Sequence, residues 1–259
     1  MTDTELAAFD AAWERFEHWL SVRAPIDRAA LLPPATAEEI AALEARLGFP
    51  LHPHVRALLQ RHDGVMPDPE PASHHAGAFL PLGHRLIGTD SIARGHEFLA
   101  DEMAELIANG YWEEDTLYGH AHQWVPFAYP IDGGIAFVDH RPGPTYGHVY
   151  ETGLGSGAVE ATRWASSLAE LFDGLAASLD TGERYLRDWP TPYELPSGHF
   201  CLVWDSRTTR PGNSGTRDWP SPRPLDSPLR SASALPPPRL GRALGALPER
   251  SRMPRVSGR

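Results

Sequence analysis

WVPFAYPIDGGIAFVDHRPGPTYGHVY, residues 124–150, is the stretch from which the fold of this chain is best inferred. Aromatic and β-branched side chains at residues 124–129 indicate a strand. Asp132-Gly133-Gly134 then supplies residues that tolerate the positive φ of a tight turn. A second apolar run at 135–138 and a third that starts at His148 follow. The sequence therefore predicts a three-stranded antiparallel meander, whose apolar face needs a cover of helices.

Helical periodicity flanks this meander on both sides. Apolar residues recur at spacings of three and four within residues 6–20, 36–48, 53–64, 90–109 and 167–182. Thr36 with Glu39, and Ser167 with Glu170, have the spacing of a capping box at a helix start. Residues 79–87 predict one or two short strands. Helices and an antiparallel meander in one chain predict an α+β fold.

The composition changes near residue 186. Residues 187–259 hold 13 of the 26 prolines, 12 of the 23 basic residues and 6 of the 34 acidic ones, so residues 1–186 carry a net charge of −17 and the remainder +6. A Pro- and Arg-rich segment with few periodic apolar residues does not bury enough surface to offset its ordering entropy. We expect one folded domain at 1–186 and a disordered tail at 187–259, with a short extended piece at 199–204.

Several classes of protein are disfavoured by simple counts. Cys201 is the one cysteine, which leaves no disulfide and no multi-cysteine metal site, and the acidic start MTDTELAAFD is unlike a signal peptide. No apolar run approaches the length of a membrane span. We expect a soluble, cytoplasmic protein without a membrane partner. A domain of charge −17 repels nucleic acid and attracts cationic partners.

Three blocks of sequence resemble a known family. They are LEARLGFPL at 43–51, the run VRALLQRHDG at 55–64, and the stretch from WVPFA at 124–128 to GHVY at 147–150. Together with a closing SLAEL helix start at 167–171, they occur in the order typical of the SUKH superfamily, the Smi/Knr type of domain. The resemblance covers most of residues 1–186.

The resemblance implies a fold and a function. The fold would be an antiparallel sheet packed with helices, and the function would be non-enzymatic, with no catalytic residue and no cofactor. In bacteria, such a domain is expected to be an immunity protein that binds and neutralises a polymorphic toxin. In fungi, it is expected to be a regulatory scaffold for cell-wall synthesis. The segment 187–259 has no counterpart in the family pattern.

Histidines offer an alternative, metal-dependent chemistry. The chain has 13, and His120, His122 and Asp139 could bind a divalent ion that activates water in a hydrolase. His-x-His places both rings on one face of a strand, but no third ligand follows at a fixed spacing. Ser156 lies between glycines, yet neither a nucleophile elbow nor a phosphate loop surrounds it. Structural or surface roles are the better interpretation of these residues, and we predict no metal site.

Acidic residues mark the candidate surface for a partner. Phe98, Leu99, Met103, Leu106 and Ile107 are expected on the buried face of the helix at 90–109. The acids on its outer face and in the following loop are Glu97, Asp101, Glu102, Glu105, Glu113, Glu114 and Asp115. A solvated helix face is the plainer interpretation of such a stripe. The alternative is a surface that attracts a basic toxin domain, with Trp112 as an aromatic anchor.

Overall fold

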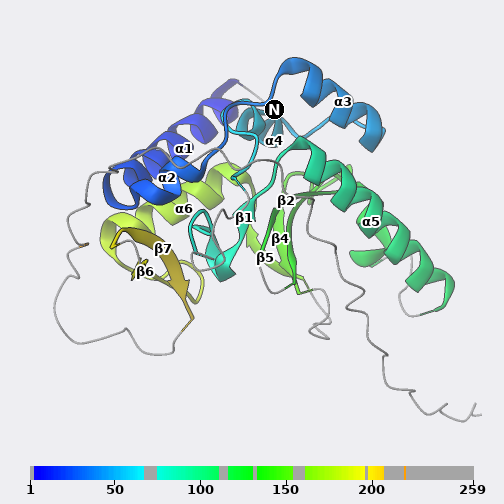
Figure 1. Ribbon diagram of the computed structural model, residues 1–259. Helices are drawn as coiled ribbons and strands as arrows, with labels where there is room; N and C mark the ends of the chain where they lie inside the picture. Colours follow the sequence, from blue (N-terminus) through cyan, green and yellow to red (C-terminus); the bar gives the residue numbers. More distant parts are fainter. Residues whose placement is uncertain are drawn as a thin grey trace, which may run out of the picture.

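A five-stranded antiparallel sheet forms the centre of the molecule (Figure 1). The computed structural model describes residues 3–66, 75–110, 116–130, 133–153, 161–195, 198–206 and 219. The strands follow one another in the order β1 Arg85–Leu86, β2 Trp124–Tyr129, β3 Ile135–Asp139, β4 Val149–Thr152 and β5 Thr162–Ala165. The predicted meander is confirmed as β2, β3 and β4, and one short strand is added at each of its edges.

Both faces of the sheet are buried, since all five side chains of β3 are shielded from solvent. Val125, Phe127 and Val138 face the main core. On the opposite face, the rings of Trp124 and Phe137 stack with centroids 3.9 Å apart, and they belong to a smaller core. Alternation along each strand thus requires helices on both sides of the sheet.

The helices cover these two faces (Figure 1). They are α1 Asp3–Arg23, α2 Pro25–Ala30, α3 Ala37–Leu47, α4 Pro53–Leu59, α5 Thr89–Ala108 and α6 Leu168–Thr181, with 3-10 turns η1 Pro81–Gly83 and η2 Tyr118–Gln123. Helices α1 and α6 meet through aromatic rings, of which Trp13 and Phe172 pack edge to face at 4.7 Å. In the described ranges, no helix is both long and apolar enough to cross a bilayer.

The helix boundaries follow the local signals. The capping box of Thr36 and Glu39 is present, and Gly48 ends α3 in the left-handed conformation with φ 79°. At α6, the Ser167 hydroxyl accepts from the amide of Glu170, but the Glu170 carboxylate accepts from the amide of Ser166. The second capping box therefore differs from the standard form, because the Glu170 carboxylate bonds to the amide one residue before the N-cap.

A C-terminal hairpin corrects the expectation of disorder from residue 187. Strands β6 Trp189–Glu194 and β7 Phe200–Asp205 pair in an antiparallel ribbon. The β7 run FCLVW buries Cys201 and Leu202 completely, and the indole of Trp204 donates to the carbonyl of Phe79 at 2.8 Å. Prolines are tolerated in β6 because it is an edge strand. The prediction of disorder is wrong for residues 189–195 and 198–205, whereas the predicted extended piece at 199–204 largely coincides with β7.

Asp27 fastens this hairpin to the domain. Its carboxylate is fully buried and accepts from the amides of Gly77 at 2.8 Å and Leu202 at 2.6 Å. Burial raises the pKa of Asp27 to about 7. The remainder of the predicted tail, residues 207–218 and 220–259, lies outside the described residues, as do Asp132 and Ser156.

Candidate partner-binding surface

The first turn of α5 is fixed by the loop that follows α4. The Asp63 carboxylate accepts from the amide of Thr89 at 2.7 Å, which is the position of an N-terminal cap. Gly64 and Gly88 allow this contact: a methyl group on Gly64 would lie 2.5 Å from the amide nitrogen of Gly88. The HDG run at 62–64 therefore sets the direction of α5.

The N-terminal half of α5 is packed closely against the sheet. A methyl group on Gly95 would lie 1.8 Å from the hydroxyl of Tyr129, so the helix backbone at this point lies directly against a side chain of β2. Ile92 and Leu99 are buried, and the His96 ring bonds to the carbonyl of His122 at 2.9 Å. These contacts hold the rest of the helix in a defined orientation.

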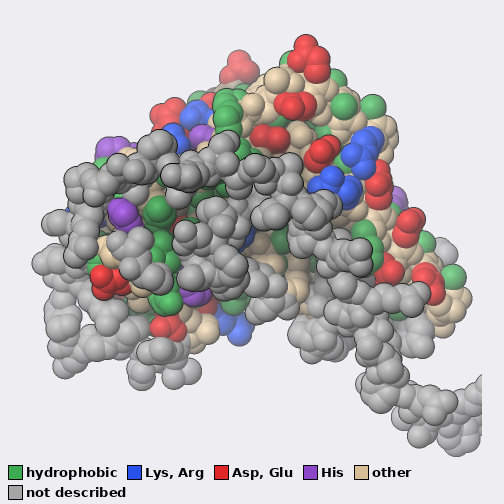
Figure 2. Space-filling model, viewed as in Figure 1, with side chains coloured by type: hydrophobic (Ala, Val, Ile, Leu, Met, Phe, Trp, Pro, Cys, Tyr) green, Lys and Arg blue, Asp and Glu red, His purple; other side chains and the backbone are tan. Residues whose placement is uncertain are grey.

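The outer face of α5 carries the predicted acids. Asp101 and Glu105 are exposed and Glu102 is half-buried. Within the part of the chain that the structure describes, no cation pairs with any of these three carboxylates. Glu97 differs, because it accepts from the Nε and Nη2 atoms of Arg46 at 3.1 and 2.8 Å. Figure 2 shows carboxylate side chains gathered along the side of the molecule that α5 forms.

Phe98 lies among these acids, which corrects its predicted place in the core. Its side chain is 40% exposed. At about 100° per residue, position 98 falls on the same side as positions 94, 101 and 105, whereas the buried Ile92 and Leu99 lie roughly 100–120° away around the helix. We call Phe98, Asp101, Glu102 and Glu105 the α5 surface. It combines an aromatic side chain with three carboxylates within about two turns of the helix.

The other predicted binding residues are not placed. Trp112, Glu113, Glu114 and Asp115 lie outside the described residues, so their relation to the α5 surface stays a prediction.

The sequence also matches a protein-family model. The model of the SMI1/KNR4 family (SUKH-1) matches residues 34–174, which is more than half of the chain and runs from just before α3 into α6. The chain belongs to the SMI1/KNR4 family (SUKH-1). The expected SUKH resemblance is thereby confirmed. No curated protein matches the chain.

The α5 surface lies inside the matched span of this SUKH-1 chain, whereas α1, α2 and the β6–β7 hairpin lie outside it. The three sequence blocks that suggested the family have structural roles. They form the end of α3, the α4 region with the cap of α5, and the central strands. They hold the surface in place and are not part of it.

The alternative metal site is not assembled. His120 and His122 lie in η2 and not on a strand, with ring centroids 6.1 Å apart. The buried carboxylate of Asp139 accepts from Nη2 of Arg141 at 2.9 Å and from its Nε at 3.0 Å. Among the described residues, no three His, Cys, Asp or Glu side chains are grouped as metal ligands.

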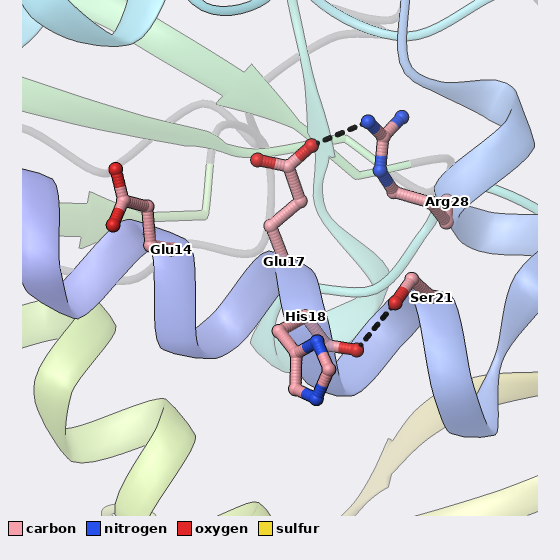
Figure 3. A pocket seen from close by; sticks show the side chains of 5 residues that line it. All are labelled: Glu14, Glu17, His18, Ser21 and Arg28. Atoms are coloured by element: carbon pink, nitrogen blue, oxygen red, sulfur yellow. Dashed lines mark hydrogen bonds and ion pairs between the residues drawn. The ribbon is translucent and has the colours of Figure 1, made fainter.

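A shallow hollow over α1 and α2 is lined by Glu14, Glu17, His18, Ser21 and Arg28 (Figure 3). Glu17 is held by Arg28 at 2.6 Å and by the rings of His62 and Trp13 at 3.1 and 2.8 Å. The hydrogen bond from His62, with the charge of Arg28, lowers the pKa of Glu17. The central carboxylate of this hollow therefore serves the packing of α1.

Proposed function

We propose that this SUKH-1 chain is a non-enzymatic protein-binding domain, and that it acts as an immunity protein that neutralises a basic toxin domain. The observation that supports this most is the α5 surface, where three carboxylates that have no cation partner among the described residues lie beside an exposed phenylalanine. Such carboxylates attract a cationic partner over distances of about 8 Å, the screening length at physiological salt.

The proposed mechanism is occlusion. A toxin that acts on nucleic acid presents a basic groove to phosphates. The α5 surface would occupy this groove in place of the phosphates, with Phe98 inserted into an apolar pocket at the centre of the contact. Because the first half of α5 is fixed against β2 and capped by Asp63, little side-chain or backbone order would be lost on binding.

A regulatory scaffold of the Smi/Knr type is the second candidate. It would use the same surface for a partner that is not a toxin, and the family membership favours it equally. The two functions differ in the partner that is captured and not in the geometry of the domain.

The test compares two triple variants of the full chain as bait in lysate of the source cell. In the first, Asp101, Glu102 and Glu105 are changed to Arg. In the second, the exposed acids Asp3, Glu38 and Glu194 are changed to Arg, which alters the net charge by the same amount away from α5. Partners are identified by mass spectrometry, and association is then measured with the purified partner.

We expect the α5 variant to lose the partner and its association rate to fall at least tenfold at low salt, with a smaller decrease for the control. The free energy of unfolding of both variants should stay within about 1 kcal/mol of the parent value, since the changes are on the surface. A basic protein with toxic activity supports the immunity function, and a non-toxic one supports the scaffold. Equal capture by both variants would exclude the α5 surface.

A further inference from the structure

A six-residue motif occurs twice in the C-terminal part of the chain. RDWPTP occupies residues 187–192 and RDWPSP occupies 217–222. The first copy forms part of the hairpin, where Trp189 pairs with Asp205. The guanidinium of Arg184 lies 5.2 Å from the ring centroid of Trp189. The second copy has Trp219 at the same position of the motif.

Trp219 lies against the C-terminal end of α1. Its ring packs edge to face on Trp19, with centroids 4.6 Å apart and planes at 89°. Its backbone carbonyl accepts from Nη1 of Arg23 at 3.5 Å. Both indoles are half-buried and extend the main core. Trp19 and Arg23 are one turn apart, and Val22, 42% exposed, lies on the same side of the helix.

We propose that this face of α1, formed by Trp19, Val22 and Arg23, is a binding site for Trp-Pro peptides, and that the chain's own RDWPSP segment fills it. The site contacts one indole and one backbone carbonyl, so it recognises a tryptophan in an extended peptide. Proline after the tryptophan favours the extended conformation and reduces the entropy lost on binding.

The tether makes the contact intramolecular. A linker of thirteen residues lies between Asp205, the end of β7, and Trp219. Such a linker gives an effective concentration on the order of 1 mM. A site with an intrinsic Kd of about 100 µM would be occupied in cis about nine-tenths of the time. Another protein with the same motif would have to displace the tail.

The test uses the full chain and a labelled peptide of residues 214–225, SGTRDWPSPRPL, followed by fluorescence anisotropy. Trp219→Ala vacates the site, so we expect this variant to bind the peptide about tenfold more tightly than the parent does. A peptide with alanine in place of tryptophan should not bind. Adding Trp19→Ala to the Trp219→Ala chain should abolish binding, and adding Arg23→Ala should weaken it several-fold without a large change in the core.

Two further measurements separate this site from the α5 surface and from misfolding. The Phe98→Ala/Trp219→Ala chain should bind the peptide as well as Trp219→Ala alone. Trypsin should cleave after Arg217 faster in Trp219→Ala than in the parent, while cleavage after Arg207 stays equal. Equal peptide affinity in the parent and in Trp219→Ala, or no binding to either, would overturn the proposal.

Discussion

Carboxylates on α1 and α6 differ from those on α5 in how they are neutralised. On the first two helices, four acids have arginine partners: Arg15 contacts Asp173 and Asp180, and Arg61 contacts Asp10 and Glu14. On α5, Arg46 neutralises Glu97, and among the described residues no cation contacts Asp101, Glu102 or Glu105. Net charge alone does not distinguish the two regions.

The difference separates acids that hold the fold from acids that are available to a partner. An exposed ion pair contributes at most about 1 kcal/mol, so the pairs on α1 and α6 are individually weak. They nevertheless cancel the field that those acids would project into solvent. The three carboxylates of the α5 surface therefore contribute charge to the −17 of residues 1–186 that no cation among the described residues cancels.

Acidification should lower the free energy of unfolding through the buried histidines, and this is the largest effect we expect. Burial lowers the pKa of His52 to about 3 and of His140 to about 4. As pH falls below 6.5, the unfolded chain takes up protons at these residues and the folded chain does not, so the free energy of unfolding decreases. Asp27 acts oppositely: with a pKa of about 7 in the folded state, it is protonated there first and stabilises the fold as pH falls toward 4.

As the pH falls, the two histidines destabilise the fold and Asp27 stabilises it. The free energy of unfolding should therefore decrease by a net of roughly 1.4 kcal/mol per pH unit between pH 6 and pH 4. Urea unfolding at several pH values measures this slope. Asp27→Asn removes the stabilising term, so its slope should be about twice as steep. A slope that is the same in both proteins would mean that Asp27 is ionised in the folded state near pH 6.

Removing one acid from each region should show the next largest difference. Glu17→Ala leaves Trp13, Arg28 and His62 without their shared acceptor in a half-buried position, and we expect a loss of about 2 kcal/mol in the free energy of unfolding. Glu105→Ala, on the α5 surface, should change it by less than about 0.5 kcal/mol. Urea titrations at pH 7 compare the two, and equal losses would contradict the assignment of Glu17 to the fold.

Local signals in the sequence predicted the elements well because their causes are local. The Thr36 capping box, the turn at Gly48 and the alternation in residues 124–150 each depend on neighbours within a few positions. Phe98 was misplaced because it was grouped with Leu99, although the two positions lie about 100° apart around the helix and the buried side is the one with Ile92, His96 and Leu99. A helical projection of residues 92–105 would have indicated its exposure.

Long-range contacts were not available from the sequence. The hairpin of β6 and β7 depends on Asp27, which lies far away in α2 and accepts from Leu202 across the core. Its prolines and the surrounding composition favoured disorder instead. Likewise, the sequence shows that Glu97 and Asp101 are acidic, but only the fold shows that Arg46 of α3 reaches Glu97 and leaves Asp101 without a cation among the described residues.

Arg46→Ala should give the smallest effect, and it tests most specifically whether carboxylates without a cation on α5 attract a partner. It frees Glu97 and so adds a fourth carboxylate beside Asp101. The ion pair is exposed, so the free energy of unfolding should fall by less than about 1 kcal/mol. Association with a basic partner should become about twofold faster at low salt, and the gain should vanish at about 1 M salt, where the screening length is about 3 Å.

Arg15→Ala is the matched control, because it changes the net charge equally but frees Asp173 and Asp180 on α6. Its association rate should change less than that of Arg46→Ala, although its loss of stability should be at least as large, since two carboxylates lose their partner. If both variants accelerate association equally, the partner responds to the total charge of the domain, and the position of the carboxylates on α5 has no special role.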